Sequence, residues 1–221
     1  MIHRAIEERI HNALAKKKAV TIMGPRQVGK STLADAIIPK DAKVLEINGD
    51  NTDVQTMFIN VDEAKMKVLI GNKNFLFVDE AQKIENVGNM LKIVAEKFKD
   101  VKIIVTGSSA FKLADAVNES LTGRKREFRL YPLSFKEMAD ETSTLEESRM
   151  IDHRLIYGYY PEVVTSPGDE KEVLKELIDS YLYKDVMEEN NIAKPDKLVK
   201  LVQALAFQLG STVAATELAG L

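Results

Sequence analysis

One stretch of the chain has the residue types and spacing of a phosphate-binding loop. It reads GPRQVGKST, which fits the pattern G-x-x-x-x-G-K-[S/T]. Gly24 and Gly29 are expected to allow backbone conformations in which successive N–H groups turn toward a β-phosphate. Lys30 would reach the β- and γ-phosphate oxygens, Ser31 offers a hydroxyl to Mg²⁺, and Thr32 is expected near the α-phosphate. The residues expected to bind nucleotide are Gly24, Pro25, Arg26, Gln27, Val28, Gly29, Lys30, Ser31 and Thr32.

A second stretch, FLFVDEAQ, places two carboxylates directly after four apolar residues. A buried strand of a parallel sheet would deliver Asp79 and Glu80 to the edge where ligands bind. Asp79 is then expected to hold Mg²⁺ together with Ser31, and Glu80 to act as general base on a hydrolytic water. Solvated carboxylates at a strand end are the alternative, which the preceding phosphate loop makes the weaker one.

The two adjacent carboxylates also separate the classes of phosphate-loop protein. A GTPase should carry an N-K-x-D base-reading motif, but the nearest match, Asn72-Lys73-Asn74, is followed by Phe75. Small-molecule kinases commonly lack the second carboxylate. The pair therefore favours ATP hydrolysis coupled to a conformational change.

Two further stretches contain candidate catalytic residues. In VTGSSA, Thr106 or Ser108 would hold the attacking water or touch the γ-phosphate, although these residue types also punctuate ordinary turns. In TGRKREF, Arg124 or Arg126 could reach a nucleotide on a neighbouring subunit, which leaves a homo-oligomer open; a solvated basic turn explains them equally well. The candidate catalytic set is Glu80, Lys30, Thr106, Ser108 and Arg124.

The elements that must position these residues follow an alternation of short apolar runs and helical patterns, which predicts βαβ units around a parallel sheet. Strands are expected over residues 19–23, 43–47, 75–78, 102–106 and 127–130. The clearest helix should follow Asn86 as N-cap, because the apolar residues after it recur at helical spacing.

After Leu130 the pattern turns helical. Two capping boxes are predicted, Ser134 with Glu137 and Thr144 with Glu147. A long amphipathic helix is expected over residues 169–189, and another from Pro195 until Gly210 ends it. The segment from residue 211 to 221 begins a further helix.

Composition and charge limit the class of protein. Of 221 residues, 45 % are hydrophobic and 29 % charged, which indicates a globular chain. No cysteine is present, so thiolate metal sites and cysteine nucleophiles are excluded. No apolar run is long enough for a membrane span, and a cytoplasmic location is expected. Residues 1–130 carry a net charge of +5 and residues 131–221 one of −8.

These motifs, together with GRKREFRLYPLSFKE and YGYYPEVV in that order, resemble the prokaryotic AAA-type ATP-binding proteins that carry the domain of unknown function 4143. The resemblance implies an α/β P-loop NTPase of the additional-strand catalytic-glutamate class, with a five-stranded parallel sheet of order 5-1-4-3-2 and an α-helical lid. It also implies a core over 1–130, a lid over 131–194, and over 195–221 the start of a winged-helix-like domain, so the chain is expected to be truncated.

The sequence therefore predicts an ATPase module that uses ATP and Mg²⁺, with no membrane partner. Two alternatives stay open. One is an ATP-gated signalling or interaction switch that hardly turns over. The other is a DNA-handling motor, for which only family analogy argues and against which the negative charge of residues 131–221 speaks.

Overall fold

The computed structural model describes residues 2–108, 120–179 and 195–218. The chain divides into two compact units, Met1–Glu162 and Val163–Leu221, and each is described by itself. The expected three-part division into 1–130, 131–194 and 195–221 stays a prediction.

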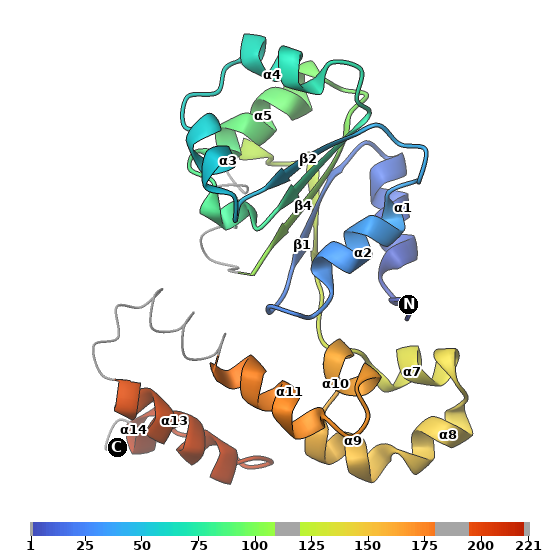
Figure 1. The fold of residues 1–221 in the computed structure, drawn as a ribbon, viewed down its shortest axis with the longest axis vertical. Coiled ribbons are helices and arrows are strands. Elements are labelled where there is room, and N and C mark those ends of the chain that lie inside the picture. Colours follow the sequence, from blue (N-terminus) through green and yellow to red (C-terminus); the bar gives the residue numbers. More distant parts are fainter. Residues whose placement is uncertain (1, 109–119, 180–194, 219–221) are drawn as a thin grey trace. The chain divides into compact units, whose positions relative to one another are not determined.

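The first unit is built on one five-stranded parallel sheet (Figure 1). The strand order is β2-β3-β4-β1-β5, which confirms the order expected from the resemblance. Helices separate β1 from β2, β2 from β3 and β3 from β4, as parallel pairing requires. The strands are β1 (Ala19–Met23), β2 (Val44–Asn48), β3 (Phe75–Asp79), β4 (Lys102–Gly107) and β5 (Lys125–Arg129).

The central strands match their predicted positions better than the edge strands do. Every residue of β1 is buried, whereas β5 buries only Phe128. The predicted strand 127–130 starts two residues after the observed start of β5, because the charged residues Lys125 and Arg126 do not look like the start of a strand in the sequence. Register with β1, in which Lys125 lies opposite Ala19, decides where this edge strand starts.

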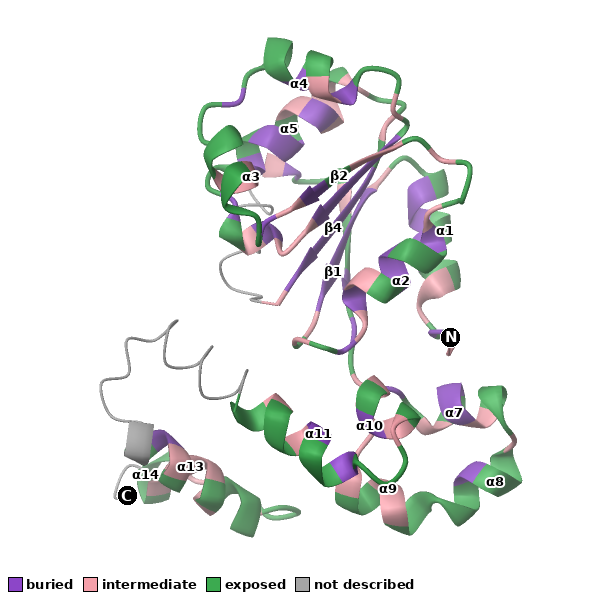
Figure 2. Cartoon of the chain, in the orientation of Figure 1, coloured by how far each residue is buried: buried purple, intermediate pink, exposed green. Residues whose placement is uncertain are grey.

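Helices cover both faces of the sheet, and the buried residues gather between them and the strands (Figures 1 and 2). On one face, α1 (Glu7–Ala15) and α2 (Lys30–Ile37) share a core cluster with side chains of β1, β3, β4 and β5. On the other, α4 (Glu63–Ile70) and α5 (Val87–Lys97) pack on the alternate residues of β1, β3 and β4 and on β2. The short helix α3 (Thr52–Met57) and a 3₁₀ turn, η1 (Ala81–Lys83), complete this face.

The helix predicted after Asn86 is confirmed as α5, but its predicted cap is wrong in detail. Asn86 has a positive φ of 56° and its side chain does not cap the helix. The side-chain amide instead donates to the carbonyl oxygen of Ile59, at 3.3 Å. A contact distant in sequence thus overrides the local capping preference of asparagine.

Three short helices follow the sheet within the first unit: α7 (Phe135–Glu141), α8 (Thr144–Arg149) and α9 (Ile151–Tyr157). The capping box of Ser134 and Glu137 is confirmed. The second predicted box is wrong by one residue, since Ser143 is the N-cap of α8 and accepts from the N–H of Glu146. Glu147 is thereby released from capping.

Glu147 is instead the centre of a buried polar cluster. Its carboxylate is only 2 % exposed and accepts bonds from Arg154 Nε at 3.0 Å and Tyr159 Oη at 2.8 Å. A buried carboxylate needs such partners, because an unpaired one would be strongly destabilising. This cluster ties α8 to the YGYYPE segment, where Gly158 takes a φ of 79° after α9.

The helices of the C-terminal part begin near the predicted places. They are α10 (Pro161–Thr165), α11 (Glu170–Leu177), α13 (Pro195–Phe207) and α14 (Ala215–Leu218). Pro195 starts its helix as expected, but that helix ends three residues before Gly210. Residues 180–189 of the predicted long helix lie outside the described residues. In the described parts of the chain, no helix has the length and apolarity needed to cross a membrane.

The hydrogen bond between Tyr159 and Glu147 should make the stability of the fold depend on pH in the alkaline range. Burial and the hydrogen bond to the Glu147 carboxylate raise the pKa of Tyr159 from 10.0 to about 12. Since the raised pKa favours the neutral phenol in the fold, this contribution to stability is full below pH 10.0 and is lost as pH rises to about 12. Tyr159→Phe should remove that loss from unfolding curves measured against pH, whereas Tyr131→Phe at an exposed tyrosine should keep it. Identical alkaline profiles for the wild type and Tyr159→Phe would contradict the assignment.

Candidate functional site

The phosphate loop follows β1 and leads into α2, which is the context that its sequence predicts. Gly24 is required for a reason other than its own conformation: a Cβ atom there would collide with the carbonyl oxygen of Leu130. Gly29 does take a left-handed conformation, with φ 93°, immediately before α2 begins. The backbone thus approaches the end of β5 closely and then turns into the helix N-terminus, where a phosphate is favoured.

Lys30 is 5 % exposed and bends back over the loop. Its Nζ donates to the carbonyl oxygens of Gly24 at 3.0 Å and Pro25 at 2.9 Å. The same Nζ lies 4.0 Å from Glu80 Oε1. The ammonium group is therefore held inside the loop and beside the acidic pair.

Asp79 joins the ends of three elements. Ser31 Oγ, from the start of α2, donates to Asp79 Oδ2 at 2.8 Å. Thr106 Oγ1, near the end of β4, donates to Asp79 Oδ1. The predicted magnesium pair, Ser31 and Asp79, is therefore in direct contact.

Glu80 lies beside this pair and is held by other residues. Its backbone is left-handed, with φ 47°, and its N–H donates to Asp79 Oδ1 at 3.1 Å. Gln82 Nε2 donates to Glu80 Oε2 at 2.6 Å and to Ser108 Oγ at 2.9 Å. Ser108 Oγ lies 3.4 Å from the same Glu80 oxygen.

The structure separates the two residues between which the sequence did not choose. Thr106 is fully buried and contacts Asp79, whereas Ser108 is half-buried and contacts Glu80. Ser108 therefore faces the candidate base, and Thr106 orients the candidate magnesium ligand. Ser109 and Ala110 lie outside the described residues.

Arg124 is not brought to this site. It precedes β5, at the amino edge of the sheet, and its guanidinium pairs with Glu96 at 2.8 Å. Arg126 lies opposite Val20, also toward that edge. The phosphate loop leaves β1 at the opposite end, and a five-residue strand spans about 16 Å. Within this chain neither arginine reaches the loop, so a role on a neighbouring subunit stays a prediction.

Arg4 is a residue of the site that sequence reasoning missed. Its side chain is buried and donates to three groups: Val28 O in the phosphate loop at 3.0 Å, Tyr131 O at 2.6 Å and Glu137 Oε1 at 3.1 Å. One guanidinium thus connects the loop with the first helix after the sheet. A lone arginine near the N-terminus carries no local pattern that would have pointed to it.

Hydrogen bonds and the charge of Arg4 favour the ionised form of the Glu137 carboxylate. Burial raises the pKa of Glu137, but bonds from the backbone N–H groups of Ala5 and Ser134 and from Arg4 outweigh burial and lower that pKa. This group stabilises the fold above its ordinary pKa of 4.5 and loses its contribution as pH falls through the lowered value.

Gly49 and Gln82 were also missed. A Cβ atom on Gly49 would collide with the carbonyl oxygen of Glu80, and its N–H donates to Asp79 O at 2.9 Å. The end of β2 is therefore packed directly against the acidic pair. The signal that could have pointed to Gln82 is its place two residues after Glu80.

The donor set fits the group that the fold implies. Ser31 Oγ and Asp79 Oδ2 are hydroxyl and carboxylate oxygens, the ligands that Mg²⁺ prefers when phosphate supplies others. Lys30 and the N-terminus of α2 supply positive charge for phosphates. Among the described residues no group of three or more His, Asp or Glu side chains forms an all-protein metal site.

Fold and site together define the chain as an α/β P-loop protein: a parallel sheet of order 2-3-4-1-5, a glycine-bounded loop after β1 and an acidic pair after β3. A family model described as AAA domain matches residues 16–139, more than half of the chain. The chain belongs to this AAA-domain family of P-loop nucleotide-binding proteins.

A second family model, Domain of unknown function (DUF8612), matches residues 148–221. It takes the place where the resemblance implied the domain of unknown function 4143.

Relatives in several prokaryotes share the core of this chain. An uncharacterized protein of Methanocaldococcus jannaschii is 28 % identical over 223 residues, which cover 93 % of this chain and 50 % of that protein. One from Haemophilus influenzae is 29 % identical over 146 residues, covering 64 % and 36 %. The chain thus spans half or less of the length of these relatives.

Among solved structures, the chain is similar to a signal transduction ATPase with numerous domains (STAND) with a tetratricopeptide repeat sensor, from Pyrococcus horikoshii. The TM-score is 0.49 at 14 % identity, covering 74 % of this chain and 29 % of that one.

The Arg4 contacts predict a specific loss of stability. Arg4→Met should lower the free energy of unfolding by about 3 kcal/mol, because it leaves the buried Glu137 carboxylate without its cation. Arg9→Met, at an exposed arginine of α1, is the matched control and should cost less than about 1 kcal/mol. Urea denaturation of both variants measures the difference, and equal losses would argue against the buried role of Arg4.

Proposed function

We propose that the chain binds ATP with Mg²⁺ and hydrolyses it, and that hydrolysis drives a conformational change. The observation that carries this proposal is the direct bond between Ser31 Oγ and Asp79 Oδ2, with Glu80 and Lys30 beside it. It supports a site in which the phosphate loop and the acidic pair act on one nucleotide.

Each residue then has a defined task. Lys30 leaves the loop carbonyls and binds the β- and γ-phosphate oxygens, while Ser31 and Asp79 hold the metal. When bound, Mg²⁺ supplies charge neutralisation to the phosphates. Glu80 accepts a proton from the attacking water at Oε1, since its Oε2 is engaged by Gln82. Ser108 lies against Glu80 and is the better candidate to orient that water.

Coupling to the helical segment runs through Arg4. A shift of the loop at Val28 changes the acceptor of one Arg4 bond, and the other bonds hold Tyr131 and Glu137 at the start of that segment. The elements on both sides share a single buried cation, which supports transmission of loop movement to α7.

Two substitutions separate binding from chemistry. Lys30→Ala should remove the nucleotide site at the phosphate loop, seen in isothermal titration with Mg²⁺ as the loss of one binding event for ATP and ADP relative to the wild type. Glu80→Gln should retain binding and lower the rate of phosphate release by about 100-fold or more, because it removes the base. A folded wild-type sample that binds neither nucleotide would overturn the proposal.

A second candidate function is an ATP-gated switch that hardly turns over. Its supporting observation is that Glu80 is already engaged, by Gln82 at Oε2 and by Lys30 at 4.0 Å from Oε1. A base held in this way is not free to take a proton until these contacts change.

Gln82→Ala distinguishes the two candidates. If Gln82 holds Glu80 in its working position, as we expect, the substitution should lower multiple-turnover phosphate release by about tenfold with nucleotide affinity unchanged. In a switch, wild-type protein would release one phosphate slowly and the substitution would speed that release. Gln55→Ala, which removes a side-chain bond to Gly49 O and none to Glu80, is the control.

A further inference from the structure

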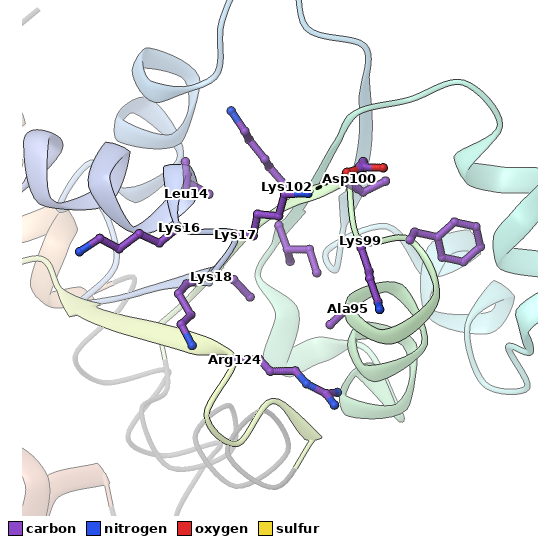
Figure 3. A pocket seen from close by; sticks show the side chains of 13 residues that line it. Leu14, Lys16, Lys17, Lys18, Ala95, Lys99, Asp100, Lys102 and Arg124 are labelled. Atoms are coloured by element: carbon purple, nitrogen blue, oxygen red, sulfur yellow. Dashed lines mark hydrogen bonds and ion pairs between the residues drawn. The ribbon is translucent and has the colours of Figure 1, made fainter.

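A hollow lies at the amino edge of the sheet, at the end of β1 opposite the phosphate loop. It has a volume of about 150 Å³ and lies where α1 ends, where β4 begins and where β5 begins. Its apolar lining includes Leu14, Ala19 and Ile103, which are buried members of the core. Figure 3 shows the labelled lysines around it, with Lys17 facing Asp100 across an ion pair.

Positive charge dominates this hollow. Six cations line it against one carboxylate, Asp100. An adjoining hollow of about 300 Å³ shares Lys16 and Lys18 and adds Arg9 and Arg126 against Glu127. Cations gathered in this way repel one another, and a bound anion relieves the repulsion. The six cations are Lys16, Lys17, Lys18, Lys99, Lys102 and Arg124.

Internal contacts neutralise only part of this charge. Lys17 pairs with Asp100 at 2.9 Å and Arg124 with Glu96 at 2.8 Å. In the parts of the chain that the structure describes, Lys16 and Lys99 have no carboxylate partner. Among the same described residues, the side chain of Lys102 contacts the ring of Phe75, with Nζ 5.3 Å from the ring centroid. Three cations at the rim are therefore available to an anion.

The carboxylates paired with Arg124 and Lys17 respond to these cations. The hydrogen bond from Arg124 is the main cause that lowers the pKa of Glu96, and the one from Lys17 lowers the pKa of Asp100. Asp100 is exposed and Glu96 is partly exposed, and Glu96 does not line the hollow.

Lys17 occupies a backbone position that favours glycine. It follows α1 with a φ of 55°, and the N–H groups of Lys17 and Lys18 donate to Leu14 O and Ala13 O. This is the Schellman ending of a helix, in which a left-handed residue other than glycine costs about 1 kcal/mol. A lysine there lowers stability and adds charge to the hollow.

We propose that this hollow is a second anion site, which binds a small compound carrying two or more phosphate groups. Its volume of about 150 Å³ is below the roughly 300 Å³ at which ordinary ligand pockets start, so the hollow suits only a small ligand. Several separate chain segments supply the cations, and arginine with lysines is the combination that phosphate groups favour. The site is distinct from the phosphate loop, which lies at the other end of β1.

The test uses the full chain with Lys30→Ala, so that the phosphate loop does not contribute. Inorganic tripolyphosphate should bind this protein in isothermal titration, and the affinity should fall as salt is raised. Adding Lys16→Glu and Lys99→Glu should weaken binding about tenfold or more. Lys40→Glu with Lys67→Glu, two exposed lysines elsewhere, changes net charge equally and should leave binding within about twofold.

Lys17→Gly guards against an effect of misfolding. It should leave the free energy of unfolding unchanged or raise it, because glycine suits the left-handed position, and still weaken tripolyphosphate binding several-fold. A lower affinity without lost stability is a result that general damage does not produce.

Three outcomes would overturn the proposal. The first is no binding of tripolyphosphate to the Lys30→Ala chain, and the second is an equal loss in the control pair. The third is binding only of a single-stranded oligonucleotide, with affinity that grows with its length, which would make this edge a nucleic-acid surface. None of them bears on the proposed ATPase function, which phosphate release by the wild type and by Glu80→Gln tests separately.

Discussion

The carboxylate of Asp79 is the group on which the nucleotide site depends. Its two oxygens receive bonds from Ser31, at the start of α2, and Thr106, near the end of β4. These contacts exist because β3, β4 and β1 are parallel and adjacent, so that their carboxyl ends meet at one edge of the sheet. Glu80 is placed by the same arrangement: its left-handed backbone turns the chain after β3 and leaves its side chain between Lys30 and Gln82.

Arg4 extends this arrangement beyond the sheet. A buried guanidinium requires several acceptors, and here they come from the phosphate loop, the segment after β5 and the first helix beyond it. The loop is thereby tied to the helical segment by a buried charge, and hydrogen bonds of this kind are sensitive to small shifts of their acceptors. Within that helical segment, the Glu147 cluster connects α8 with the YGYYPE segment by buried hydrogen bonds.

The two edges of the sheet have different chemistry. At the carboxyl edge, acidic and hydroxyl side chains face a glycine-bounded loop, whereas at the amino edge lysines and arginines surround an apolar hollow. The positive charge of residues 1–130 therefore belongs in large part to the edge away from the phosphate loop. Arg124 illustrates this, because the strand register that pairs Lys125 with Ala19 carries it to the amino edge.

Local patterns were sufficient to predict the strands, the phosphate loop, the acidic pair and the Ser134 capping box, since each depends on residues that are close in sequence. The strand order came from the resemblance to a family rather than from periodicity. Tertiary structure alone decided which residues surround these motifs. Arg4 and Glu137 are 133 positions apart, Gln82 and Ser108 are 26 apart, and Ser143 replaced Thr144 as N-cap where Glu147 was drawn into a buried cluster. Long-range hydrogen bonds and the burial of charge have no short-range signature, and they decide which residues each motif contacts.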